Sequence, residues 1–266
     1  AFKKGYLAGD EALKVGTDNG SIQRHISGCT AVSALVTENW KLYVSNAGDS
    51  RAVLSSSGKA IPMSTDHKPT NNDESERIWN AGSFVELGRV SGALALSRAI
   101  GDFSFKSNAD LPPEKQAVTS LPDVIERQLT PNDQFIVLAC DGIWDCLTNQ
   151  GVTNFVLQHL SKESPETNLK DICESMLTFC LEQSQTSEPG GPGWDNMTLI
   201  IVAFIGVGDY VVAVSSESEE FESEKAKAAY IKWVDSVEAN LKQNGIDRKT
   251  LEIETVAQQP SIFAQP

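Results

Sequence analysis

The chain has 266 residues, of which 40% are hydrophobic and 22% charged, and its formal net charge is −14 at pH 7. This length predicts one large soluble domain with a sizeable core, together with an appendage. A surface this negative argues against nucleic acid and anionic membranes as partners, and phosphorylated substrates would need a cation to offset the repulsion locally.

An amphipathic helix at the N-terminus is followed by short strands. Residues 30–37 and 41–47 alternate in hydrophobicity and predict two strands. The segment 51–54 follows the turn at 48–50, and we expect it to pair back as the third strand of an antiparallel meander. The Ser-rich stretch 55–58 then predicts another turn.

The middle of the chain predicts a short helix and a buried strand. The helix covers about 73–81, with Ile78 and Trp79 facing inward, and Gly82 is a typical C-terminal stop. The run 135–140 (FIVLAC) is apolar throughout and predicts a strand in the core.

Two helices are expected between this strand and another at 198–205. The second has apolar residues three and four positions apart over 169–181, and Cys173 and Cys180 lie on that apolar face. We interpret both as core residues, because free cysteine is usually buried. Hairpins and helices without regular β-α-β alternation predict an α+β fold.

The composition changes after Gly208. An acidic run over 217–224 precedes a helix-like stretch with Tyr230 and Val234 on one face, and the pattern weakens from about 245. We therefore expect two parts: residues 1–208 as the main domain, and 209–266 as an acidic linker, a helix and a loose C-terminal tail.

The sequence lacks the motifs of several common catalytic and metal sites. Five cysteines without a C-x-x-C pair, and three histidines away from zinc-ligand spacing, favour a reduced intracellular protein over a secreted or zinc-bound one. There is no P-loop sequence, and no cysteine is followed six residues later by arginine. Ser50 could act as a hydrolase nucleophile, but no histidine has the acid partner that this requires, which leaves a weak alternative.

Three aspartates share one context, the end of a strand or its turn: Asp49, Asp141 and Asp195. Each alone is more often a turn former. If they converge, two carboxylates ~4 Å apart repel by roughly 4 kcal/mol at an effective dielectric near 20. No lysine is adjacent in sequence to any of them, so a hard divalent cation is the sharpest hypothesis for the counter-charge.

Six separated motifs carry a resemblance to a known family. Their order and spacing over residues 1 to about 206 resemble the metal-dependent type 2C protein serine/threonine phosphatases, and the run from 94 to 124 is similar to fungal members. The motifs are SGCTAVSALV, NAGDSRAVL, DHKP, ERIWNAGSFVELGRVSGALALSRAIGDFSFK, FIVLACDGIWD and WDNMTLIIV.

This resemblance implies a four-layer α-β-β-α sandwich of two antiparallel sheets flanked by helices, with two or three Mn²⁺ or Mg²⁺ ions at one end. By resemblance, Asp141 is a direct, bridging metal ligand, Asp195 is another, and Asp49 binds a weaker third ion. A water shared by two metals would have a lowered pKa and attack the phosphoserine or phosphothreonine phosphorus. The resemblance further implies phosphorylated proteins as substrates, a monomer, and a cytoplasmic or nuclear location.

Further residues are placed by the same resemblance. Thr30 and Asp145 correspond to groups that hydrogen-bond metal-bound waters, and Asn196 flanks the site. Arg98 and Asp102 lie in the stretch that matches the flap beside the catalytic centre, and we expect them to be structural.

One departure from the family pattern concerns the start of the chain. The family carries an Asp-Gly-His-Gly segment that supplies the principal bridging aspartate, and this segment is absent from 1–266. The chain starts at Ala1 inside a helix and retains Asp49, Asp141 and Asp195, so we expect a fragment of an active enzyme. If 1–266 were complete, we would expect weak Mn²⁺ binding, little activity and a phosphatase-like binding module instead.

Overall fold

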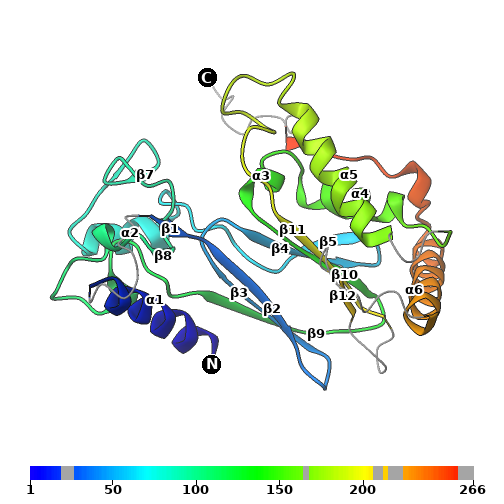
Figure 1. The fold of residues 1–266 in the computed structure, drawn as a ribbon, viewed down its shortest axis with the longest axis horizontal. Coiled ribbons are helices and arrows are strands. Elements are labelled where there is room, and N and C mark those ends of the chain that lie inside the picture. Colours follow the sequence, from blue (N-terminus) through cyan, green and yellow to red (C-terminus); the bar gives the residue numbers. More distant parts are fainter. Residues whose placement is uncertain (19–26, 164–167, 206–211, 215–223, 257–266) are drawn as a thin grey trace. The chain divides into compact units, whose positions relative to one another are not determined.

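The computed structural model describes residues 1–18, 27–163, 168–205, 212–214 and 224–256, and these form two compact units (Figure 1). The first unit contains Ala1–Leu35, Tyr43–Arg51 and Ser64–Glu126. The second contains Val36–Leu42, Ala52–Met63 and the chain from Arg127 onward. The acidic run expected at 217–224 lies almost wholly outside the described residues.

The first unit combines two α-helices with short strands. In chain order its elements are α1 (Phe2–Asp18), β1 (Gly28–Cys29), β2 (Ala31–Val36), β3 (Lys41–Ala47), α2 (Asn72–Asn80), β6 (Val85–Glu86), β7 (Arg89–Val90), β8 (Ile100–Gly101), the 3₁₀ turns η1 (Phe103–Phe105) and η2 (Pro113–Lys115), and β9 (Asp123–Gln128).

Helix α1 is fixed to the first unit by polar side chains on its inner face. The Tyr6 hydroxyl lies 3.1 Å from Ser33 Oγ on β2. Asp10 is buried, where its carboxylate accepts the Gly101 N–H at 2.7 Å and pairs with Lys106 Nζ at 2.7 Å. The N-terminal helix expected from the sequence is therefore a packed part of this unit.

Helix α2 has one apolar contact with the core of the first unit. Ile78 is fully buried, but 73% of Trp79 is exposed, so the expectation that both face inward was wrong. Neighbouring residues are about 100° apart around a helix, so one apolar face rarely buries both. The predicted stop is confirmed, because Gly82 takes a φ of +84° and its N–H donates to Trp79 O.

The expected meander is wrong in its pairing. Strands β2, β3 and β9 form a three-stranded sheet with β3 in the middle, whereas β4 (Arg51–Ser56) belongs to the five-stranded sheet of the second unit. The turn after Ala47 therefore sends the chain into another sheet, which turn residues alone do not reveal. The hairpin from β4 to β5 (Lys59–Pro62) is confirmed, with positive φ at Ser57 and Gly58.

The second unit is built on a sheet in the order β12-β11-β10-β4-β5. After β4 and β5, its elements are β10 (Asp133–Ala139), α3 (Asp141–Trp144), α4 (Asn149–His159), α5 (Asn168–Gln183), β11 (Leu199–Ala203), β12 (Val212–Val214), α6 (Glu224–Gln243) and the 3₁₀ turn η4 (Arg248–Thr250). The pairs β10–β11 and β11–β12 are antiparallel.

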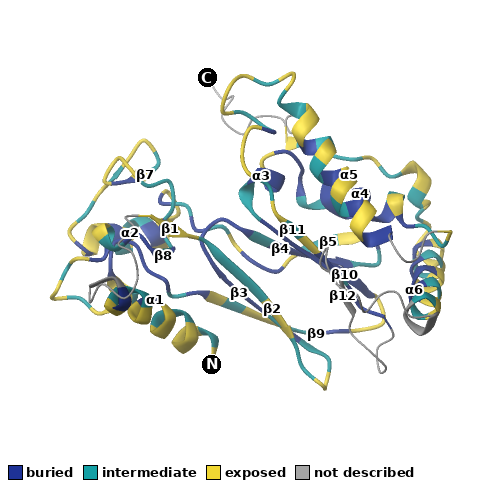
Figure 2. Cartoon of the chain, in the orientation of Figure 1, coloured by how far each residue is buried: buried dark blue, intermediate teal, exposed yellow. Residues whose placement is uncertain are grey.

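The core of the second unit lies between this sheet and its helices (Figure 2). Every residue of β10 is buried, as the apolar run predicted. Buried side chains of α4, α5 and α6 join the same cluster, Cys180 among them, and Cys173 packs against it. On α6, Trp233 also donates its indole N–H to Gln134 O at 3.2 Å, so this helix is part of the core.

The chain after α6 returns along α4. Glu254 O accepts the Thr148 N–H at 3.1 Å, and Val256 N–H donates to Cys146 O at 3.0 Å. Asn154 donates to Glu252 O at 2.7 Å. Residues up to Val256 are thus held by hydrogen bonds, and the loose end expected from the sequence could begin only after them, where 257–266 lie outside the described residues.

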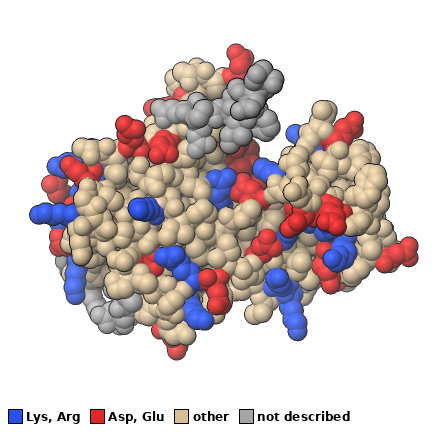
Figure 3. All heavy atoms as spheres, turned by 180° about the vertical axis from the view of Figure 1, so that it is seen from behind, with Lys and Arg blue, Asp and Glu red and all other residues tan. Residues whose placement is uncertain are grey.

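Charged side chains of both signs lie on the face of the molecule that Figure 3 shows. On the face in Figure 3, acidic and basic side chains are interspersed, without a broad basic area. Among the helices that the structure describes, none is long and apolar enough to cross a membrane.

Candidate functional site

Asp141 stands where the buried strand β10 gives way to the short helix α3. The strand ends at Ala139, Cys140 is extended, and Asp141 is the first residue of α3. Trp144, five residues after the end of the strand, donates its indole N–H back to Ala139 O at 2.8 Å. This turn leaves Asp141 half-buried at the rim of the core, as the sequence predicted.

The strand register brings the Asp141 turn against the chain that follows Asp195. Ala139 is paired with Leu199, and Cys140 N–H donates to Thr198 O at 3.1 Å. The contact is so close that a Cβ on Gly142 would lie 2.3 Å from Asn196 O. Only glycine fits there without movement of the backbone. Asp141 directly precedes Gly142, and Asp195 directly precedes Asn196, so each aspartate is next in sequence to one side of this tight contact.

The other predicted residues of the second unit lie on the same two segments. Asp145 N–H donates to Asp141 O at 2.7 Å, which completes the turn of α3, and the Asp145 side chain is exposed. Asp195 is exposed as well, and its Oδ1 accepts the N–H of Asn196 at 2.7 Å.

Asp49 and Thr30 belong to the first unit, where they lie on touching segments. Thr30 Oγ1 is 2.8 Å from Ser50 Oγ, and a Cβ on Gly48 would be 2.4 Å from Thr30 Cγ2. Gly48 has a φ of +118°, which glycine adopts without strain. The tight turn holds Asp49 in a buried position.

The sequence analysis expected a metal ion to neutralise the aspartates, and for Asp49 the structure shows a different counter-charge. The carboxylate of Asp49 is paired with the ammonium of Lys68, nineteen residues further along the chain. The absence of an adjacent lysine had pointed to a metal ion, but the fold supplies a lysine from the DHKP motif. Metal is therefore not required to neutralise Asp49 in this structure.

The predicted ligands in the second unit are of the chemical type that a hard divalent cation prefers. Asp141 and Asp195 offer carboxylate oxygens beside a backbone contact that leaves no room for a side chain at Gly142. Across the described ranges, no three His, Cys, Asp or Glu side chains are grouped to hold a metal ion. A cation held by Asp141 and Asp195 would need water or further ligands.

A buried ion-pair network supports the Asp49 turn, and sequence reasoning missed it. Glu74 accepts from Arg98 Nη2 and Arg77 Nη1, both at 2.7 Å. Arg98 Nη1 also pairs with Asp123 at 2.8 Å. His67 links Asp123 to the turn, because its Nε2 lies 3.1 Å from Asp123 Oδ2 and its Nδ1 accepts the Gly48 N–H at 3.2 Å.

This network agrees with the structural role expected for Arg98. Burial alone would raise the pKa of Glu74, but the hydrogen bond from Arg98 and the charge of Arg77 lower it to about 2. The hydrogen bond from His67, followed by the charge of Arg98, also lowers the pKa of Asp123. Both carboxylates therefore hold their protons less tightly in the folded protein than in the unfolded chain.

We expect the protein to lose stability in acid through these groups. A lowered pKa contributes stability that is complete above the ordinary glutamate value of 4.5 and is lost as the pH falls toward about 2. The part of the free energy of unfolding that depends on the ionisation of Glu74 is about 3 kcal/mol at most. Urea unfolding between these pH values measures the loss. The variant Glu74→Gln should show a shallower decline, and an equal decline would contradict this origin.

Comparison with known proteins gives consistent matches. A family model described as Protein phosphatase 2C matches residues 1–188. Protein phosphatase 2C homolog 2 of Schizosaccharomyces pombe is 49% identical over 205 residues, which cover 77% of this chain and 53% of that protein. The protein of the same description in Hypocrea jecorina is 50% identical over 204 residues, covering 77% and 44% respectively. The chain thus spans about half the length of the curated relatives it matches.

Solved structures have the same fold. A phosphatase from a pathogenic strain of Toxoplasma gondii has a TM-score of 0.53 and 32% identity, over 65% of this chain and 51% of that one. A serine-threonine phosphatase 2C from Toxoplasma gondii has a TM-score of 0.59 over 75% of this chain and 65% of that one. At 22% identity, the second supports the mixed helix-and-sheet fold alone.

Proposed function

Because this chain belongs to the protein phosphatase 2C family, we propose that the protein hydrolyses phosphoserine and phosphothreonine in phosphorylated proteins with the help of divalent cations. The family is metal-dependent in general. The observation that carries the proposal is the tight contact between the Asp141 turn and the segment after Asp195, because Asp141 and Asp195 are sequence neighbours of the residues that make this contact.

The proposed roles follow from this placement. Asp141 and Asp195 would bind Mn²⁺ or Mg²⁺, and Asp145 and Asn196 would accept or donate hydrogen bonds that orient the surrounding water. Such cations, when bound, lower the pKa of water and neutralise charge on phosphoryl oxygens.

For two residues of the first unit, roles are proposed from the family resemblance alone. Thr30 would orient water by hydrogen bonding, and Asp49 would bind a weaker third ion, sharing its carboxylate with Lys68. The buried network around Glu74 would act on Asp49 only by holding its turn in position.

We infer the larger arrangement from the family as well. The fold class proposed from the family is a four-layer α-β-β-α sandwich of two antiparallel sheets flanked by helices. Residues 1–208 would form the catalytic domain, and within 209–266 the helix α6 would complete its core.

The activity is tested with the whole protein and a phosphothreonine peptide. We expect Mn²⁺ or Mg²⁺ to raise phosphate release at least about tenfold over the protein treated with a chelator, because charge on the phosphoryl group needs a cation. Restoring the metal should restore the rate. Release that is equal with and without chelator would contradict the proposal, and no release under either condition would favour a phosphatase-like binding module.

A further inference from the structure

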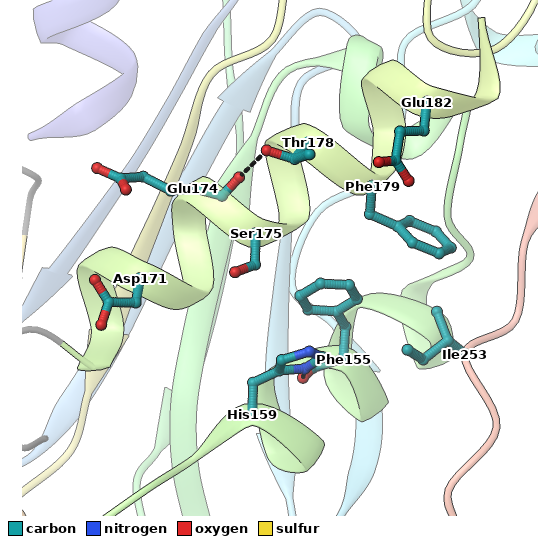
Figure 4. A pocket seen from close by; sticks show the side chains of 9 residues that line it. All are labelled: Phe155, His159, Asp171, Glu174, Ser175, Thr178, Phe179, Glu182 and Ile253. Carbon is teal, nitrogen blue, oxygen red and sulfur yellow. Dashed lines mark hydrogen bonds between the residues drawn. The ribbon is translucent and has the colours of Figure 1, made fainter. Parts of the chain in front are cut away.

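A surface hollow in the second unit has no role in the proposed chemistry. Its volume is about 550 Å³, and it lies between α4, α5 and the returning segment around Ile253 (Figure 4). None of its lining residues belongs to the candidate metal site. They are Phe155, His159, Asp171, Glu174, Ser175, Thr178, Phe179, Glu182 and Ile253.

The floor of the hollow is apolar and aromatic. Phe155 is buried, while Phe179 and Ile253 are half-buried. The rings of Phe155 and Phe179 meet edge to face, with 5.6 Å between their centroids. The His159 ring stacks on Phe155 at 4.3 Å, and its Nδ1 donates to Phe155 O at 2.8 Å. This floor offers a fixed apolar contact that solvent can reach.

The rim along α5 is acidic. Asp171, Glu174 and Glu182 are all exposed on this helix, and Figure 4 shows Asp171 and Glu174 toward one end of it and Glu182 toward the other. Lys170 Nζ lies 3.7 Å from Glu174 Oε1, an exposed pair that offsets only part of this charge. The carboxylates are spread along α5, and no group of three in the described residues could hold a metal ion.

We propose that this hollow docks a basic segment of a partner protein, with one apolar side chain on the aromatic floor and Lys or Arg residues on either side of it. Apolar floor and acidic rim together match a cationic, amphipathic segment better than either feature alone. At 1.5 Å per residue, Asp171 and Glu182 are about 16 Å apart along the helix, a distance that about five extended residues span.

Other occupants fit the charges less well. A second copy of this chain carries a formal net charge of −14 and would bring repulsion to an acidic rim. The inference does not depend on the proposed phosphatase activity, because no residue of the hollow is assigned a role in it.

The test measures binding of a fluorescent peptide to the whole protein by anisotropy at low salt. The peptide has Leu-Phe at its centre and a pair of Arg residues at each end. We expect saturable binding that weakens at least about tenfold with the double variant Glu174→Lys and Glu182→Lys. Both positions are exposed, so the fold is retained, which a thermal melt confirms.

Two controls separate docking from general attraction. Glu38→Lys reverses an exposed charge on the loop between β2 and β3, far in sequence from α5, and should change binding less than about twofold. A second peptide with Ala-Ala at its centre should bind at least about tenfold more weakly, because it lacks the apolar anchor. Equal weakening by Glu38→Lys, or equal binding of the Ala-Ala peptide, would overturn the proposal, as would no saturable binding at all. Self-association of the protein that the rim variant abolishes would overturn it too, in favour of a second copy.

Discussion

Replacing Asp141 by asparagine is expected to reduce metal-stimulated phosphate release from a phosphothreonine peptide by more than about a hundredfold. Even residues that only orient a metal ligand cost 10- to 100-fold when they are replaced, so a direct ligand should cost more. Asparagine keeps the size of the side chain, and Asp141 lies at the start of α3 with its main-chain bonds unchanged. The loss should therefore come from metal binding.

The readout should separate metal binding from folding. In the whole protein, Mn²⁺ should raise the melting temperature, and Asp141→Asn should abolish that rise while the melting temperature without metal changes little. Glu38→Gln, at an exposed loop position, serves as the matched control and should keep both activity and the Mn²⁺ effect. Near-normal turnover by Asp141→Asn would refute the role assigned to Asp141.

Glu74→Gln is expected to lower the free energy of unfolding by about 3 kcal/mol or more. Glu74 is 3% exposed and receives two guanidinium groups and the Ser97 hydroxyl. Removing one partner from a buried ion pair typically costs about 3–5 kcal/mol, because the opposite charge stays buried. Arg98 keeps Asp123, whereas Arg77 loses its only carboxylate among the ion pairs of the described residues.

Urea unfolding at pH 7 measures this difference. Glu76→Gln is the matched control, because Glu76 lies on the exposed side of the same helix and its loss should change stability by less than about 0.5 kcal/mol. If Glu74→Gln unfolds at the same urea concentration as the control, the network contributes no net stability, and its lowered pKa values would have no consequence for folding.

The sequence predicted the elements that local patterns define. The run 135–140 has no polar residue, which is typical of a buried strand. The Asp-Gly pair that follows it marks the end of the strand, where Asp141 lies. The hairpin at 55–58 and the stop at Gly82 were predicted for the same reason, because a turn residue fixes the backbone within a few positions.

Features that depend on distant residues were not predictable in this way. Lys68 reaches Asp49 across nineteen positions, and Glu74 meets Arg98 across twenty-four. In both cases nothing local distinguishes these residues from other charged side chains of a solvated surface. The predicted strand pairing was wrong for the same reason. The turn at Gly48 specifies a change of direction but not the sheet that the next strand joins.

The return of the chain along α4 has a consequence for where this protein can be shortened. The family match ends at residue 188, yet β11, α6 and the segment up to Val256 complete the core that contains β10. A cut at 188 would uncover one edge of β10 and the buried faces of α4 and α5, exposing apolar surface and open strand edges of the kind that aggregate. We therefore expect a piece that ends at residue 188 to be less stable than one that extends to Val256.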